Sequence, residues 1–177
     1  MSMEFLTWPW MKLFFAEQTD KYKFAHASHA LTFIPYGVAV DEFQHWVYEN
    51  PEVTPAERDA KWRAIEKKYM PERTYDGNDY LENGGFWKKQ RHIFNSPFYY
   101  IDYTLAQICA FQFWQRSLAD AEDAWTDYLK LCKAGGSMSF LKLVGYANLR
   151  SPFDEDCMQD VIVKVIEWLN GVDDNNL

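Results

Sequence analysis

A histidine and three tyrosines lie within the twelve residues that run from His92 to Tyr103. Tyr99 and Tyr103 are four residues apart, a spacing that places two side chains on one face of a helix. A tyrosine hydroxyl at the wall of a cleft donates a hydrogen bond without carrying charge. Such a donor suits the oxyanion that forms when water attacks a carbonyl group. The alternative is an aromatic core helix whose hydroxyls bond to backbone groups.

Other histidines are candidates for a metal site. His26 and His29 are three residues apart and could reach one ion from the same helix face. His45 follows Asp41 and Glu42, an arrangement that resembles a zinc-peptidase helix with one histidine missing. The sequence contains no H-E-x-x-H motif, no Gly-rich phosphate loop and no G-x-S-x-G elbow. We therefore favour structural roles for these histidines.

The composition excludes several classes of protein. The 177 residues include 18 Lys and Arg against 26 Asp and Glu, and a net charge of −8 argues against general nucleic-acid binding. Apolar residues make up 48% and aromatic residues 18%, which excludes a disordered chain. Three well-separated cysteines are typical of reduced thiols in a cytoplasmic protein. No stretch reaches the roughly 20 apolar residues of a membrane span.

Helix signals recur along the whole chain and predict an all-α fold. The clearest is Thr54 followed by Pro55 and Glu57, a capping box that starts a helix ending near residue 69. Pro35 is expected to separate two helices, because proline disfavours helix in the residue before it. We also expect one helical domain over residues 1–170 and a frayed acidic tail over 171–177. The other predicted helices lie near residues 5–19, 22–33, 36–48, 80–94, 97–118, 121–134, 137–146 and 154–170.

Several longer strings resemble the C-terminal part of oligoendopeptidase F, among the thimet-type zinc oligopeptidases. The subgroup is often called Pz-peptidase-like, and the strings match it in order over essentially the whole chain. The resemblance implies an all-helical, two-lobed enzyme that cleaves short peptides in a deep channel. This chain would be a multi-helix bundle corresponding to its C-terminal lobe. The strings are SMEFLTW at 2–8, IPYGVAVDEFQHW at 34–46, SPFYYIDYTLA at 96–106 with His92 ahead of it, and KAGGS at 133–137.

The resemblance also implies a catalytic zinc ion whose ligands this sequence lacks. In the family, the two histidines of H-E-x-x-H and a downstream glutamate hold zinc, and the motif glutamate activates water. The motif is missing here, and the resemblance places the third ligand upstream of Met1. We therefore expect a fragment of a zinc-dependent oligoendopeptidase that binds no catalytic zinc and is inactive alone. The alternative is a non-catalytic helical module that binds a peptide or a protein.

By the same resemblance, five residues match functional positions of the family. His92 matches a substrate-binding histidine. Tyr100 and Tyr103 are the preferred matches for the substrate and oxyanion tyrosines, and Tyr99 is the alternative one register away. Glu4 would lie about two helical turns beyond the glutamate ligand, which suggests that it accepts a hydrogen bond from a zinc histidine. The alternative is that Glu4 is a surface or helix-capping residue.

The resemblance also predicts the partners of the chain. They are a short peptide substrate and the missing N-terminal lobe. Helices that lose that lobe would expose apolar surface, and self-association into a homo-oligomer is one way to cover it. Neither nucleic acid nor a membrane is an expected partner, and the expected location is cytoplasmic.

Overall fold

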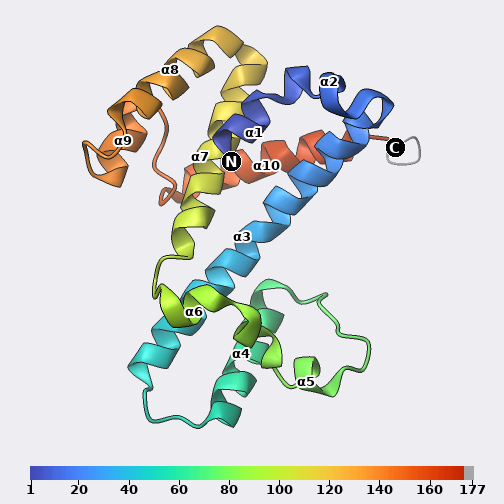
Figure 1. The fold of residues 1–177 in the computed structure, drawn as a ribbon, viewed down its shortest axis with the longest axis vertical. Coiled ribbons are helices and arrows are strands. Elements are labelled where there is room, and N and C mark those ends of the chain that lie inside the picture. The colour runs from blue at the N-terminus through green and yellow to red at the C-terminus, as the bar shows by residue number, and fades with distance from the viewer. Residues whose placement is uncertain (174–177) are drawn as a thin grey trace. The chain divides into compact units, whose positions relative to one another are not determined.

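The computed structural model describes residues 1–173 and builds them from helices (Figure 1). No strand occurs among these residues, which confirms the predicted all-α fold. No helix in this range is long and apolar enough to cross a membrane. Most of the predicted acidic tail, residues 174–177, lies outside the described residues. The helices are α1 (Ser2–Leu6), η1 (Trp8–Trp10), α2 (Lys12–Phe15), η2 (Ala16–Gln18), α3 (Thr19–Glu49), α4 (Pro55–Tyr69), α5 (Asp79–Glu82), η3 (Gly85–Lys89), α6 (Arg91–Asn95), α7 (Ile101–Ala119), α8 (Ala121–Ala134), α9 (Phe140–Tyr146) and α10 (Glu155–Asn170).

The chain divides into two compact units. Unit 1 comprises Met1–Leu31 and the described part of Leu105–Leu177, and unit 2 comprises Thr32–Thr104. The long helices α3 and α7 each contribute residues to both units. The expectation of one helical domain over residues 1–170 stays a prediction.

The core of unit 2 is built on α3 and α4. Phe43 packs edge-on against Trp62, with ring centroids 5.4 Å apart, and lies 5.0 Å from Trp87. Tyr100, from the segment that carries the candidate tyrosines, belongs to the same buried cluster. One side of the candidate site is therefore anchored in this core.

Helix α3 runs without a break through Pro35, so the predicted separation into helices at 22–33 and 36–48 is wrong. A proline inside a helix removes one backbone hydrogen bond and costs about 3 kcal/mol. Val40 and Phe43, further along the same helix, are fully buried. Burying such a side chain contributes about 1.5–3 kcal/mol. Burial in the core therefore offsets the local preference that the sequence pattern expresses.

The single helix expected over residues 80–94 is wrong as well, because the structure has α5, η3 and α6 in its place. Gly84 adopts a φ of +95°, and a Cβ atom there would lie 1.9 Å from the backbone oxygen of Asp59. Only glycine allows the chain to turn this closely against α4. Helix α7 begins at Ile101, later than the predicted start at residue 97.

The sequence predicted helix starts more accurately than helix lengths. The Thr54 hydroxyl accepts the backbone N–H of Glu57, and the Glu57 carboxylate accepts the Thr54 N–H at 2.8 Å, which confirms the predicted capping box. Asp120 caps α8, which begins at residue 121 as predicted. Helix α9 begins at Phe140 after its N-cap Ser139, later than the predicted start at residue 137. The hydrogen bonds that cap α4 and α8 join residues two or three apart, so local sequence is enough to predict them.

The N-terminal segment folds around an aromatic cluster rather than into the long helix expected near residues 5–19. It forms α1, η1, α2 and η2, and Ala16 leaves the helical region with a φ of +46°. Phe5 is 1% exposed and its ring lies 4.4 Å from the ring of His26. Burial of these rings in unit 1 decides the local path of the chain. The aromatic cluster of unit 1 consists of Phe5, Trp8, His26, Trp114 and Trp168.

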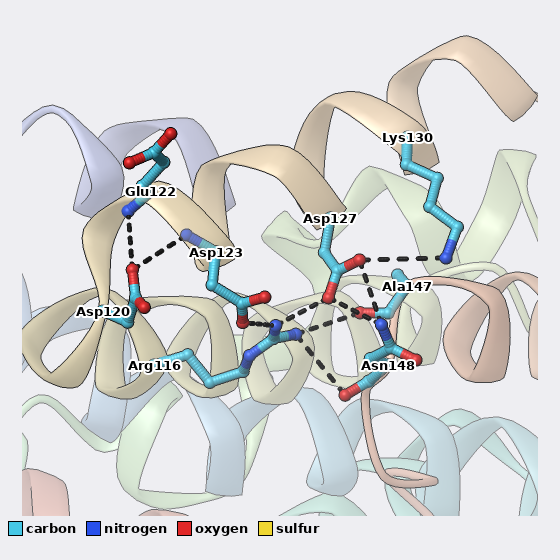
Figure 2. Close-up of polar contacts among 8 residues, drawn as sticks. All are labelled: Arg116, Asp120, Glu122, Asp123, Asp127, Lys130, Ala147 and Asn148. Carbon is cyan, nitrogen blue, oxygen red and sulfur yellow. Dashed lines mark hydrogen bonds and ion pairs between the residues drawn. The ribbon is translucent and has the colours of Figure 1, made fainter.

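A charged network in unit 1 ties α7 and α8 to the turn after α9 (Figure 2). The Arg116 guanidinium donates to Asp127 at 2.6 Å and to the backbone oxygen of Ala147 at 3.1 Å. Asn148, which has a left-handed φ of +54°, donates its amide to the Asp127 carboxylate. The Arg116 hydrogen bond holds the pKa of Asp127 below its usual range. The buried carboxylate thus stays ionised and fixes the turn.

Candidate functional site

Of the four candidate residues, His92 lies on α6, Tyr99 and Tyr100 lie on the turn between α6 and α7, and Tyr103 lies in the first turn of α7. Tyr99 and Tyr100 precede the first residue of α7, yet their carbonyl groups accept the backbone N–H groups of Asp102 and Tyr103 at 3.1 and 3.2 Å. These bonds continue the helical register backward. The side chains of Tyr99 and Tyr103 therefore meet as their spacing predicts, although only Tyr103 is in the helix.

The turn contains a backbone strained at Phe98, which has a φ of +59°. Positive φ is uncommon for a bulky residue and needs support from its surroundings. The Phe98 ring supplies it by packing 4.8 Å from the ring of His45 and 4.9 Å from that of Tyr48, both on α3. The strained residue is thus held in place by two side chains of α3.

The tyrosine cluster, defined as His92, Tyr99, Tyr100 and Tyr103, is a set of mutually packed rings. Tyr103 is at its centre, with ring centroids 5.3 Å from Tyr99, 5.4 Å from Tyr100 and 5.7 Å from His92. All three contacts are edge-to-face, the arrangement that aromatic pairs prefer. The structure therefore brings together the four candidates that the sequence analysis found between His92 and Tyr103.

Exposure differs within the tyrosine cluster. Tyr99 is 46% exposed, whereas Tyr100 is 9% exposed. Burial raises the pKa of Tyr100, and a hydrogen bond with Tyr99 is the main cause that raises the pKa of Tyr103. The hydroxyls of Tyr100 and Tyr103 are therefore neutral donors at neutral pH. Tyr99 and its partner Tyr103 form the accessible side of the cluster, and Tyr100 forms the side that faces the core.

Two further residues, Gln90 and Tyr36, are linked to His92 by hydrogen bonds, and the sequence pattern did not predict them. The side-chain amide nitrogen of Gln90 lies 2.6 Å from Nδ1 of His92. The hydroxyl of Tyr36, on α3, donates to Oε1 of the same Gln90 at 2.8 Å. Gln90 is the N-cap of α6 and has an extended backbone. Helical spacing does not bring residues two apart together, so the pattern gave no signal for this contact.

Close packing of α3 against the start of α7 fixes the height of the tyrosine cluster along α3. A Cβ atom at Gly37 would lie 2.0 Å from Oγ1 of Thr104, which follows directly after Tyr103. Thr104 is itself buried. Gly37 therefore permits an approach that no larger residue would allow, and this approach positions the first turn of α7.

Comparisons with known proteins give the family of the chain. The model of peptidase family M3 matches residues 2–161. The chain belongs to peptidase family M3. Three solved structures are similar to it over nearly its whole length. They are PZ peptidase A with inhibitor 2 (66% identity, TM-score 0.95), an oligoendopeptidase F determined at 3.1 Å (61%, 0.97) and an oligoendopeptidase F from Bacillus anthracis strain Ames (56%, 0.83).

The M3 chain spans about a third of the length of these solved relatives. The matches cover 98–99% of this chain and 31%, 31% and 28% of the other chains, in the order given above. A search of curated proteins found no match. The family and the similarity to oligoendopeptidase F confirm the resemblance seen in the sequence.

The expectation that this chain binds no catalytic zinc ion stays a prediction. Among residues 1–173, no group of three or more His, Cys, Asp and Glu side chains is placed to hold a metal ion. Nδ1 of His26 accepts the indole N–H of Trp8 at 3.0 Å. His45 lies 3.5 Å from the carboxylate of Asp41 and contacts Phe98 through its ring. These histidines have packing and pairing partners within the chain.

Glu4 lies in unit 1, on α1, and its side chain is mostly exposed. Its carboxylate pairs with the N-terminal ammonium of Met1 at 2.9 Å and lies 3.9 Å from Nε2 of His26. The bond to the ammonium is the main cause that lowers the pKa of Glu4. The carboxylate is therefore ionised and has a histidine nearby, while its expected contact with a zinc histidine stays a prediction.

A cavity of about 750 Å³ lies in unit 1 and is largely apolar. Glu4 and the four residues of the tyrosine cluster are not among those that line it. Trp10, which lines the cavity, is 59% exposed, and Leu13 and Phe14, a few residues further along the chain, are 78% and 75% exposed. Its tryptophans are Trp8, Trp10, Trp114, Trp125 and Trp168.

Proposed function

We propose that this chain is the part of an M3 oligoendopeptidase that holds the peptide through the tyrosine cluster, and that it does not hydrolyse peptides alone. The observation that carries the proposal is the geometry around Tyr103. Three aromatic rings fix its position, and its hydroxyl is hydrogen-bonded to the exposed Tyr99. A neutral donor held this rigidly suits a peptide carbonyl oxygen as it gains negative charge.

The proposed roles follow the differences within the tyrosine cluster. Tyr103 donates to the carbonyl oxygen, and Tyr99 supports the Tyr103 hydroxyl and contacts the peptide from the exposed side. Tyr100 is the alternative for the first role, because the family resemblance matches it as well. Its burial in the core of unit 2 favours a wall position instead. His92 binds the peptide through the imidazole nitrogen that Gln90 does not occupy.

Hydrolysis requires groups that this chain does not carry. The 177 residues contain no H-E-x-x-H motif, and hence neither the two histidine ligands nor the general base of the family. These groups and the remaining lobe would come from outside the chain. In that assembly Glu4 is proposed to accept a hydrogen bond from a zinc histidine. We also propose that the assembly works in the cytoplasm on short peptides.

A non-catalytic interaction module is the second candidate function. The observation that favours it is the exposed apolar side chains of unit 1, which include Trp10 at the tryptophan-lined cavity and Leu13 and Phe14 on the following helix. Monomeric proteins seldom expose large contiguous apolar patches. The missing lobe or a second copy of this chain would cover such a surface. On this alternative, the tyrosine cluster would be a packed wall and not a binding site.

The binding of a short unstructured peptide to the 177-residue chain tests the proposal. We expect NMR titration to shift the signals of Tyr99 and Tyr103, and Tyr103→Phe to weaken the affinity severalfold. Tyr146→Phe, at an exposed position of unit 1, is the matched control and should bind as the unaltered chain does. Equal affinities for all three chains would contradict the assignment. A quenched-peptide assay with added zinc should show no turnover by the chain alone.

The coding sequence directly upstream separates the two candidate functions. An H-E-x-x-H motif there would favour part of a peptidase over an independent interaction protein. Light scattering adds a second measurement, because self-association is expected if the apolar surface of unit 1 is uncovered.

A further inference from the structure

The polar groups of Tyr36, Gln90 and His92 form a chain of hydrogen bonds behind the tyrosine cluster. The Tyr36 hydroxyl donates to Oε1 of Gln90 at 2.8 Å, and the Gln90 amide nitrogen lies 2.6 Å from Nδ1 of His92. An amide nitrogen carries two hydrogens and has no acceptor capacity. The Gln90 nitrogen therefore donates, and Nδ1 of His92 must be the acceptor.

The hydrogen bond at Nδ1 determines whether the other imidazole nitrogen, Nε2, carries a proton. A neutral imidazole carries one proton, and the hydrogen bond at one nitrogen decides which nitrogen holds it. With Nδ1 accepting, the proton of His92 is on Nε2. That nitrogen is then a donor, which is the polarity that a peptide carbonyl oxygen requires.

We propose that Gln90 is a positioning residue that fixes His92 as an Nε2–H donor toward the peptide. This inference rests on the proposed function, because it takes the peptide as the acceptor. Gln90 itself touches no substrate in this proposal and acts only through His92. Tyr36 is the outer member of the chain and orients the Gln90 amide by occupying its oxygen.

The surroundings of Tyr36 show why the orientation is fixed. Its ring packs edge-on against Trp62 at 6.2 Å, Phe86 at 6.1 Å and Tyr100 at 5.9 Å. Burial raises the pKa of Tyr36, so its hydroxyl keeps the proton that it donates to Oε1 of Gln90. The Gln90 amide thus receives a hydrogen on its oxygen side from a rigid group, and only its nitrogen side is left for His92.

The imidazole of His92 is also held from its other side. Its ring is edge-on to Tyr103 and lies 5.0 Å from Tyr100. These contacts restrict rotation of the ring but do not select a tautomer, because aromatic packing does not distinguish the two ring nitrogens. The choice between the tautomers therefore depends on the Gln90 amide.

Two substitutions at Gln90 separate this inference from a purely structural role. In Gln90→Glu, a carboxylate replaces the amide and can only accept, so the proton of His92 should move to Nδ1. In Gln90→Leu, the partner is lost at nearly constant volume, so both tautomers should be populated. Tyr36→Phe should loosen the amide and give a smaller change in the same direction as Gln90→Leu.

The test is the histidine ¹⁵N NMR spectrum of the full 177-residue chain, recorded about two pH units above the ordinary histidine pKa near 6.5. We expect a protonated Nε2 and an unprotonated Nδ1 for His92 in the unaltered chain, and the reverse in Gln90→Glu. His26 is an internal control, because its Nδ1 accepts from Trp8 and should not change. A proton on Nδ1 of His92 in the unaltered chain, or no change in Gln90→Glu, would overturn the inference.

Peptide affinity, measured on the same variants, distinguishes the positioning role of Gln90 from the peptide-binding role of His92. We expect His92→Ala and Gln90→Glu each to weaken binding of a short peptide roughly threefold to tenfold, the effect of one lost hydrogen bond. If His92→Ala weakens binding and Gln90→Glu does not, the positioning role is overturned while the proposed function stands. If neither substitution changes binding, the proposed role of His92 in peptide binding fails, whatever the tautomer.

Discussion

Each unit of the molecule contains one histidine set into an aromatic cluster, and the two clusters differ in what they expose. In unit 1, Nδ1 of His26 accepts the indole N–H of Trp8 at 3.0 Å. In unit 2, Nδ1 of His92 faces the Gln90 amide at 2.6 Å. The same nitrogen is thus occupied by a neutral donor in both places. The remaining surroundings decide whether the histidine can do chemistry.

The cluster of unit 1 is built for packing. The His26 ring is stacked on Phe5 at 4.4 Å and on Tyr22 at 5.6 Å, and Phe5 is almost fully buried. The cluster of unit 2 has a hydroxyl on every ring around its histidine, and the Tyr99 ring is half-exposed. A histidine in an aromatic environment is therefore not informative alone. Hydroxyl groups and access to solvent distinguish a candidate site from a core.

The largest expected effect is on stability, and it should be confined to the packing cluster. Phe5→Ala removes a buried aromatic ring and should lower the free energy of unfolding by about 3–5 kcal/mol. The matched variant Tyr99→Ala, at a half-exposed position, should lower it by no more than about 1 kcal/mol. Urea unfolding followed by circular dichroism measures both. Equal losses would show that the two clusters do not differ in this way.

Phe5→Leu serves where Phe5→Ala does not fold. It keeps an apolar side chain of similar size, and its cost should be near the roughly 1.5 kcal/mol upper range of tolerated core exchanges.

For catalysis, the larger effect is expected in the tyrosine cluster of unit 2. In an M3 peptidase chain that carries this sequence together with the zinc-binding motif, Tyr103→Phe should lower kcat by roughly 10²–10³-fold, as for other lost oxyanion donors. Folding stability should change little, because the ring and its edge contacts are kept. Steady-state kinetics with a short quenched peptide measures the effect. A loss confined to KM would contradict the oxyanion role.

Tyr99→Phe and Tyr100→Phe are the controls for that experiment. Tyr99 supports the Tyr103 hydroxyl, so its loss should have a smaller effect on kcat. A larger effect at Tyr100 than at Tyr103 would move the oxyanion role to the buried ring.

The comparison also shows which parts of the structure could be predicted from the sequence. The all-α fold, the capping box at Thr54 and the convergence of Tyr99 with Tyr103 depend on contacts a few residues apart, and the sequence predicted them. The continuity of α3 through Pro35 was not predictable locally, because burial elsewhere on the helix decides it. The turn at Gly84 depends on the backbone of Asp59, which no local pattern reveals.

The candidate site divides in the same way. Four of its residues lie in one short segment and were found by residue type and by resemblance. Gln90 and Tyr36 were missed, because a contact across 54 residues and a contact at a spacing of two residues have no periodic signature. Residues that orient a functional group are therefore harder to find than the group itself.

Removing the donor that faces each histidine, Trp8 at His26 or Gln90 at His92, should lower the free energy of unfolding by different amounts. Trp8→Phe removes the indole N–H and leaves Nδ1 of His26, whose side chain is 17% exposed and packs on the buried Phe5 ring, without its donor, which should cost about 1–3 kcal/mol. Gln90→Leu removes the corresponding donor at the half-buried His92, where water can replace it, and should cost less than about 1 kcal/mol. Paired urea unfolding curves measure the difference. A cost at Gln90 equal to that at Trp8 would remove the distinction between a structural and a functional donor.

The smallest expected effect is a pH dependence of stability that arises from His26 in unit 1. Burial is the main cause that lowers the pKa of His26, and it outweighs the nearby Glu4 carboxylate, while the Met1 ammonium and His29 add to the lowering. The unfolded chain therefore binds this proton more tightly than the folded chain does. The contribution of His26 is complete above its ordinary pKa near 6.5, and it falls as the pH decreases from there toward the lowered value.

Urea midpoints recorded between about pH 7.5 and pH 5 measure this loss, in a range above the ordinary carboxylate pKa values near 4. His26→Gln keeps a side-chain acceptor for the Trp8 indole and cannot titrate, so its midpoint should fall less steeply over this range. His45→Gln, at an exposed histidine of α3, is the comparison variant. If the urea midpoints of His26→Gln and His45→Gln change with pH at the same slope, burial does not disfavour the charged form of His26. The contrast between the two clusters then rests on packing alone.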